Sequence, residues 1–186
     1  MRSDARANRQ DLVLAAGRLL HEQGAAMSLR SVAHAAGVGI GTLYRHFPTR
    51  RDLLIAVMDQ VVGRIEEILR RFLDGDDAPE VRWRRLADEL AGENLTTLLS
   101  AKGAVTPRDC PPIDLYEAAE ERILTLTQSV VETAQAAGLV GEDVTGDRYL
   151  GGLLTVTRPF LPELEEEMRD QRDWLLDVYL RGLRAA

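Results

Sequence analysis

The chain has 186 residues, of which 45% are hydrophobic, 28% charged and 5% aromatic. These values are close to those of globular proteins and disfavour disordered, collagen-like and coiled-coil classes, while the length allows one or two small domains. The longest stretch without Asp, Glu, Lys or Arg has 14 residues, 31–44, which is short of the roughly 18 to 20 that a membrane span needs. The N-terminus has no long apolar segment of a secretory signal, and the single Cys110 cannot form a disulfide within the chain. We therefore expect a cytoplasmic protein without membrane contact.

The net charge of −7 is unevenly distributed along the chain. Residues 1–50 contain seven Arg and three acidic residues, a net charge of +4, whereas residues 51–186 have a net charge of −11. The first 50 residues are thus basic and the rest of the chain is acidic. The overall acidity argues against non-specific coating of nucleic acid. A locally basic face can still bind phosphates, because salt screens charges beyond about 10 Å.

Helical periodicity runs through the whole chain, and no run of alternating apolar and polar residues predicts a strand. The spacing predicts an all-α protein of eight or nine helices. The expected helices span about 12–24, 28–36, 40–47, 50–73, 79–101, 114–137, 145–160 and 162–183.

Local signals mark several of the expected helix ends. Ser28 and Thr49 are N-cap candidates, Gly37 and Gly138 are stops, and Pro48 ends the third helix. Residues 103–112, with three prolines, form the clearest loop.

The two short helices at 28–36 and 40–47, joined by a turn that contains glycine, fit a helix-turn-helix. A tight corner between two helices without DNA-binding function has the same spacing, so spacing leaves both interpretations open. If Leu43 and Phe47, four residues apart, face the core, then Gly41 and Arg45 point the opposite way. Such an outward face is able to enter a major groove of DNA.

The segment GVGIGTLYRHFPTR at 37–50, preceded by Ser28 and Val32-Ala33 and followed by Leu53-Leu54, resembles the DNA-binding domain of the TetR family of bacterial transcriptional regulators. The resemblance covers about residues 8–58. It implies an N-terminal three-helix helix-turn-helix DNA-binding domain, residues 1–48, and a helical effector-binding and dimerisation domain, residues 49–186.

The resemblance also implies roles for individual residues. Contacts to the DNA backbone are expected from Ser28, Tyr44, His46, Thr49 and Arg50, and contacts to base edges from Ile40, Gly41 and Thr42. Gly39 allows a close approach of the backbone, and Arg30 and Arg45 are candidates for additional contacts, Arg45 either to a guanine or to a phosphate. The family often has Ser or Thr at the position of Gly39 and a polar residue at that of Ile40. Because Ile40 is apolar, a thymine methyl group is its most suitable partner.

Other interpretations of these residues are open. Tyr44 and Phe47 are also compatible with plain core aromatics, and His46 with a charge partner of the helix C-terminus. Arg2, Arg6 and Arg9 fit either a basic arm that reaches the minor groove or a solvated, disordered tail.

Nothing in the sequence predicts catalysis or a resident cofactor. The three histidines are 13 and 12 residues apart, which is not the spacing of a zinc site, and no phosphate-binding GxxxxGK[ST] loop is present. Cys110 lies between Asp109 and Pro111, where a surface thiol is favoured over a nucleophile. The acidic run from Glu163 to Glu167 is typical of a solvated helix face. We therefore expect no enzyme, no cofactor and no metal.

One recognition helix contacts only about four base pairs, so two copies on a near-palindrome are expected. In the TetR family the last two helices usually pair with those of a second copy. The corresponding candidates for a dimer interface are Leu150, Leu153, Leu154, Thr157, Trp174 and Val178. Gly151-Gly152 would allow a close helix approach. The same residues also fit an ordinary core within one chain.

Members of the family commonly bind a small molecule among the central helices. Candidates for lining such a cavity are Met58, Phe72, Trp83, Leu86, Tyr116, Leu124, Gln128 and Val131; each also fits a plain core position. The leading hypothesis is a homodimeric repressor of a palindromic operator that a small-molecule effector releases from double-stranded DNA. The alternatives are a DNA-binding regulator without effector, an activator, or a helical ligand-binding or interaction module whose N-terminal corner is structural.

Overall fold

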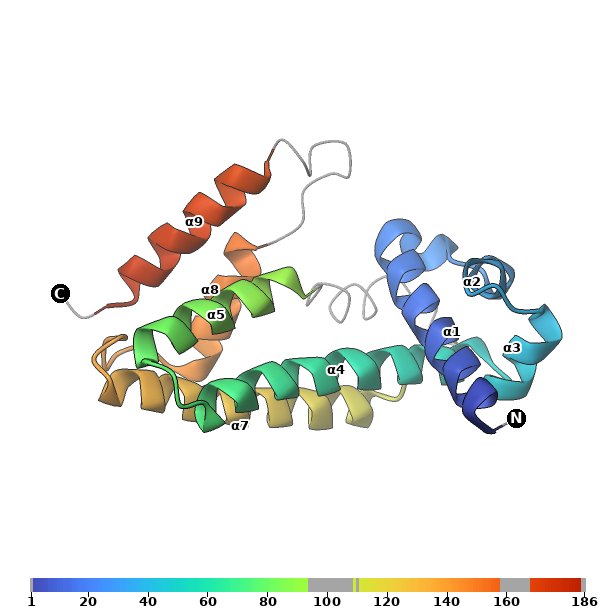
Figure 1. The fold of residues 1–186 in the computed structure, drawn as a ribbon, viewed down its shortest axis with the longest axis horizontal. Coiled ribbons are helices and arrows are strands. Elements are labelled where there is room, and N and C mark those ends of the chain that lie inside the picture. Colours follow the sequence, from blue (N-terminus) through green and yellow to red (C-terminus); the bar gives the residue numbers. More distant parts are fainter. Residues whose placement is uncertain (1, 94–108, 110, 158–167, 185–186) are drawn as a thin grey trace. The chain divides into compact units, whose positions relative to one another are not determined.

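The computed structural model describes residues 2–93, 109, 111–157 and 168–184. These residues form eight α-helices and one short 3-10 helix, with no strand among them (Figure 1). In chain order the helices are α1 (Arg2–Gln23), the 3-10 helix η1 (Gly24–Ala26), α2 (Leu29–Ala35), α3 (Ile40–His46), α4 (Arg50–Asp74), α5 (Pro79–Gly92), α7 (Ile113–Ala136), α8 (Gly146–Val156) and α9 (Arg169–Gly182). The predicted all-α class is confirmed.

The chain divides into two compact units. The first comprises residues 1–63 and 97–117, and the second comprises residues 64–96 and 118–186. Helices α4 and α7 each begin in the first unit and end in the second.

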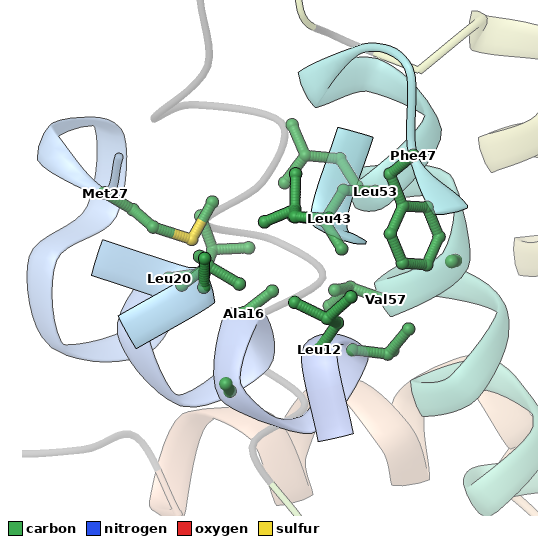
Figure 2. Close-up of a cluster of buried hydrophobic side chains, with 14 residues drawn as sticks. Leu12, Ala16, Leu20, Met27, Leu43, Phe47, Leu53 and Val57 are labelled. Carbon is green, nitrogen blue, oxygen red and sulfur yellow. The ribbon is translucent and has the colours of Figure 1, made fainter. Parts of the chain in front are cut away.

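The first unit contains a three-helix arrangement in which α1, α2 and α3 contact one another. Its core collects apolar side chains from these helices and from the start of α4 (Figure 2). The side chains with at most 2% exposure are Leu12, Ala15, Ala16, Leu20, Met27, Val32, Leu43, Phe47, Leu53 and Leu54. Each buried leucine or phenylalanine contributes about 1.5 to 3 kcal/mol through the hydrophobic effect. This core fixes how α3 is presented to solvent.

Short hydrogen-bonded motifs fix both ends of α2. The Ser28 hydroxyl accepts a hydrogen bond of 3.0 Å from the Ser31 backbone N–H, and the Ser31 hydroxyl accepts one of 3.2 Å from the Ser28 N–H. These reciprocal bonds are a capping box. At the other end, Gly37 has a φ of +67°, and the N–H of Val38 bonds the carbonyl of Ala33 at 3.0 Å. This left-handed ending is a Schellman motif, so the predicted cap and stop of this helix are confirmed.

The second unit is built around an aromatic cluster. The Trp83 ring of α5 contacts Phe72 of α4 at 5.9 Å and Tyr149 of α8 at 4.9 Å between centroids. Tyr179 of α9 stacks on Tyr149 at 6.4 Å, and its hydroxyl donates a 2.6 Å hydrogen bond to the Tyr149 carbonyl. A Cβ on Gly152 would lie only 2.5 Å from the Tyr179 ring, so α8 and α9 approach closely there within one chain.

Ion pairs at the surface connect the helices of the second unit. Arg71 of α4 pairs with Glu89 of α5 at 2.7 Å, and Arg122 of α7 pairs with Glu66 of α4 at 2.8 Å. The hydrogen bond from Arg122 lowers the pKa of Glu66. Arg84 of α5 pairs with Asp177 of α9. The arginines of these pairs are 41% to 59% exposed, and ion pairs at a protein surface contribute about 0 to 1 kcal/mol each, so burial of the aromatic cluster provides more of the stability.

Several predicted boundaries differ from the structure. Helix α1 begins at Arg2, so the segment that contains Arg2, Arg6 and Arg9 is helical and the predicted disordered tail is wrong, while the basic arm that reaches the minor groove stays a prediction. Helix α5 ends at Gly92, before the expected residue 101, because glycine in a helix has a high conformational entropy cost. Helices α8 and α9 are likewise shorter than expected on the sides that adjoin residues 158–167.

Some predictions fall on residues outside the described part of the chain. They concern most of the loop at 103–112, Cys110, and the acidic run at 163–167. Among the helices that the structure describes, none has both the length and the apolar character required to cross a lipid bilayer.

Candidate nucleic-acid interface

Helix α3 has one buried side and one exposed side. Leu43 is 0% exposed and Phe47, the residue that ends the helix, is 2% exposed. On the other side, Ile40 is 39% and Tyr44 is 51% exposed. Figure 2 shows Leu43 and Phe47 directed into the core of the first unit. The predicted division of α3 into an anchoring side and an outward side is therefore confirmed.

The start of α3 presents almost bare backbone. Gly39 occupies the N-cap position with φ −70° and ψ 146°, and no side chain caps the first N–H groups. A Cβ added at Gly39 or Gly41 would meet no atom within 4 Å. Open backbone N–H groups at this point permit a close approach by another molecule.

Arg45 is held on the outward side of α3. Its Nη2 donates a 3.0 Å hydrogen bond to the hydroxyl of Thr42, one helical turn earlier. In the described part of the chain no carboxylate lies within 4.0 Å of Arg45, so its positive charge is not neutralised there. His46, which follows in the last turn, is half-buried beside the Phe47 ring at 6.4 Å. The end of α3 therefore presents basic groups.

Ser28, Arg30 and Thr49 lie at the starts of neighbouring helices and are exposed. The Thr49 hydroxyl accepts a 3.1 Å hydrogen bond from the Asp52 N–H and donates one of 2.7 Å to the Asp52 carboxylate. Ser28 and Thr49 thus act as helix caps, as the sequence predicted, and both hydroxyls stay at the surface.

Arg50 is oriented differently from the other predicted contacts. Its side chain is 18% exposed, and its Nε lies 4.0 Å from the carboxylate of Asp109. Its Nη1 donates a hydrogen bond to the Met27 carbonyl at the end of η1. These contacts of the Arg50 side chain are therefore with other residues of its own chain. No local pattern predicts this, because both partners are distant in the sequence.

The residues predicted to line a ligand cavity are found in both units. In the first unit, Met58 and Tyr116 are buried. In the second unit, four of the predicted residues are buried and two are half-buried: Phe72, Trp83, Leu86 and Val131, then Leu124 and Gln128. Phe72 and Leu86 line a hollow of about 10 Å³, which is the size of one water molecule.

Gln128 has a structural role that the sequence did not indicate. Its Oε1 accepts a 2.7 Å hydrogen bond from the N–H of Gly146, the first residue of α8. Its Nε2 donates a 3.1 Å hydrogen bond to Glu132. Gln128 thereby caps a helix whose own N-cap residue, Thr145, forms no side-chain cap.

A larger, open cleft of about 430 Å³ lies between α5 and α9. It is lined by Glu80, Trp83, Arg84, Leu139, Asp177, Leu180, Arg181 and Arg184. Trp83 is a member of the predicted ligand set.

The predicted dimer residues differ in exposure. Leu153 is 0% exposed and therefore lies inside the second unit, while Leu150, Leu154 and Thr157 are half-buried. Trp174 and Val178, four residues apart on α9, are 54% and 40% exposed. On the same helix, Leu176 and Leu180 are buried. Helix α9 thus has apolar residues on two sides, of which one is open.

Comparison with known proteins agrees with this architecture. Residues 12–57 match the family described as bacterial regulatory proteins of the tetR family, and residues 66–185 match the SbtR-like transcriptional regulator C-terminal domain. An HTH-type transcriptional regulator of Staphylococcus aureus (strain USA300) is 41% identical over 61 residues, 32% of this chain and 33% of the relative. That similarity covers about a third of the staphylococcal protein.

Solved structures extend the similarity to nearly the whole chain. The TetR transcriptional regulator SCO0520 of Streptomyces coelicolor is 27% identical with a TM-score of 0.76, over 96% of this chain and 99% of that one. The TetR transcription regulatory protein of Mycobacterium vanbaalenii is 28% identical with a TM-score of 0.59, over 99% of both chains.

The buried anchor and outward face of α3, joined to α2 by a glycine turn, form a helix-turn-helix, and the match of residues 12–57 identifies it as that of a DNA-binding regulator. The chain belongs to the TetR family of transcriptional regulators, because the two family models together cover most of its length. This is a family of regulators that are not enzymes.

Proposed function

We propose that this protein is a repressor that binds a palindromic operator as a dimer and leaves it when a small-molecule effector binds. The observation that carries the DNA-binding part is the exposed face of α3, with Tyr44 and Arg45 outward and Leu43 and Phe47 anchored in the core. Ile40, Gly41 and Thr42 would contact base edges, and Tyr44 and His46 the backbone on either side.

The apolar surface of α9 supports the proposal of a dimer. Trp174 and Val178 form an exposed stripe at a spacing of four residues, while Leu176 and Leu180 bind α9 to its own chain. Exposed aromatic residues at such a stripe are typical of protein interfaces. A dimer paired through α9 would have two α3 helices, one for each half-site of a palindrome.

A cleft in the second unit supports the proposal of a small-molecule effector. The cleft of about 430 Å³ between α5 and α9 falls in the range of small-molecule sites, roughly 300 to 1,000 Å³. Release from the operator requires that the effector bind the DNA-free conformation more tightly than the DNA-bound one.

The DNA-binding proposal is tested with a fluorescein-labelled duplex from upstream of the protein's own gene. Anisotropy is measured at two salt concentrations, with a scrambled duplex of equal length as competitor. A salt-dependent complex of two chains per duplex that resists the competitor supports a specific operator. No binding to either duplex at low salt contradicts the proposal and favours the helical interaction module.

The dimer is tested with a matched pair of valine variants. Val178→Arg places a charge in the proposed interface, whereas Val81→Arg changes an equally simple side chain that is 51% exposed on α5. We expect sedimentation to show a monomer for Val178→Arg and a dimer for Val81→Arg. If both variants sediment as dimers, the assignment of the Trp174 and Val178 surface to the dimer interface is contradicted.

The effector is tested by adding a set of small metabolites to the protein–DNA complex and measuring anisotropy and thermal unfolding. A compound that raises the unfolding temperature of the free protein and releases the DNA supports the proposal. A regulator without effector would respond to none of them.

A further inference from the structure

The first turns of α1 continue the core-facing side of that helix as a basic surface. Val13, Ala16 and Leu20 are at most 4% exposed and lie in the core of the first unit. Arg9 precedes Val13 by four residues, and Arg6 precedes Arg9 by three. Positions at this spacing share one side of a helix. Arg6 and Arg9 therefore lie on the side of α1 that faces its partners, beyond the point where the apolar core ends.

The structure shows where Arg9 lies. Its guanidinium carbon is 5.1 Å from the centroid of the Phe47 ring, a cation–π contact. Phe47 ends the recognition helix and is itself next to the His46 ring at 6.4 Å. Arg9 is thereby placed beside the basic last turn of α3, although the two residues are far apart in the sequence.

The chemistry of this contact leaves Arg9 able to bind an anion. A guanidinium that stacks on an aromatic ring uses its flat face and keeps its N–H donors at the edge for a carboxylate or phosphate. Arg9 is exposed, and among the described residues no carboxylate lies within 4.0 Å of it. Because Phe47 already fixes the side chain, binding an anion costs less side-chain entropy than for a free arginine.

We propose that Arg9, positioned by Phe47 and followed on the same side by Arg6, binds a DNA backbone phosphate next to the recognition helix. This inference rests on the proposed DNA-binding function. It gives the basic N-terminal segment a fixed role as a helical phosphate contact. The contact adds affinity without sequence preference, because phosphates are the same at every base pair.

The test separates the charge of Arg9 from its packing. Arg9→Met keeps an unbranched apolar side chain over the Phe47 ring and removes the charge. Arg18→Met is the matched control, since Arg18 lies nine residues further along α1, on the opposite side of the helix, and is exposed. Binding to the upstream duplex and to its scrambled form is measured over a series of NaCl concentrations, and thermal unfolding is measured in parallel.

We expect Arg9→Met to unfold at the wild-type temperature and to bind both duplexes about tenfold more weakly. The slope of log K against log salt should be shallower by about 0.9 for each bound chain. Arg18→Met should match the wild type in both quantities. Arg9→Met with wild-type affinity and slope, or with weaker binding at an unchanged slope, overturns the phosphate contact. Wild-type protein that binds neither duplex contradicts the proposed function itself.

Discussion

At the scale of single residues, Gly41 allows folding and DNA binding to be separated. It lies in the first turn of α3, is exposed, and has open space where a Cβ would be. Gly41→Ala should raise stability by up to about 1 kcal/mol, because alanine favours helix more than glycine does. The same methyl group keeps the backbone away from DNA and should lower operator affinity. Denaturant unfolding and anisotropy measure the two effects.

Gly63→Ala is the control for this experiment. Gly63 is in α4, is exposed and also has open space around it, since an added Cβ would meet no atom within 4 Å. Gly63→Ala should give a similar gain in stability with unchanged DNA affinity. If Gly41→Ala binds the operator as tightly as wild type does, the backbone at Gly41 does not closely approach DNA.

A second residue-scale prediction concerns the uncapped start of α3. Gly39 is at the N-cap with extended backbone angles and provides no side-chain acceptor. Gly39→Ser should raise stability by a few tenths of a kcal/mol, because a serine hydroxyl accepts a hydrogen bond from an N–H of the first turn. The hydroxyl is also the group that the TetR pattern often places there to contact a phosphate, so operator affinity should rise. Gly39→Ala, which lacks the hydroxyl, should show neither gain, and a gain with alanine would refute the capping explanation.

At the scale of helices, Gly152 controls the pairing of α8 with α9. A Cβ there would lie 2.5 Å from the Tyr179 ring, whose hydroxyl is bonded to the Tyr149 carbonyl. Gly152→Ala should therefore destabilise the protein by about 1 to 3 kcal/mol, the usual cost of overpacking. Gly151→Ala, next to it but with nothing within 4 Å, should be neutral or stabilising. Thermal unfolding of the two variants tests this prediction. Equal unfolding temperatures would show that Tyr179 moves aside at no cost in free energy.

Helix positions and ends were predictable where their causes are local. Gly37 and Gly138 both end helices with positive φ, as their sequence positions indicated, and Ser28 and Thr49 cap the helices that follow. The start of α1 was not predicted, because its first turns have no apolar period. Arg6 and Arg9 continue the side of the helix on which Val13, Ala16 and Leu20 are buried.

At the scale of the whole molecule, contacts between residues far apart in the chain could not be predicted from the sequence. The sequence does not indicate that Arg50, a predicted phosphate contact, bonds the Met27 carbonyl and lies 4.0 Å from the Asp109 carboxylate. Nor does it indicate that Gln128, a predicted ligand-lining residue, caps α8 through Gly146. In each case the partner is far away in the sequence, so only the folded arrangement reveals the contact, and the phosphate and ligand contacts stay predictions. The exposed face of α3 was predictable because a family motif and helical periodicity agree there.

The free energy of unfolding of the whole molecule should decrease in alkaline solution because of Tyr149, which is buried, and Tyr179, which is half-buried. Burial raises the pKa of Tyr179 to about 12, and burial also raises the pKa of Tyr149. In the unfolded chain both ionise near pH 10, so above that pH the unfolded state has lost protons that the folded state keeps. The free energy of unfolding is therefore unaffected by these groups below about pH 9 and decreases as the pH rises from about 10 towards 12.

Urea unfolding at a series of pH values measures this decrease. The chain contains one Lys, one Cys and four Tyr, so the contribution of Tyr179 is taken from the difference between the wild type and a Tyr179→Phe variant. Tyr179→Phe removes one of the two hydroxyls, so its stability should be lower at pH 8, where the bond to the Tyr149 carbonyl is lost, and should decrease less steeply above pH 10. A wild-type free energy of unfolding that stays constant up to pH 12 would mean that both phenols are accessible to water. The close packing of α5, α8 and α9 around them would then be wrong.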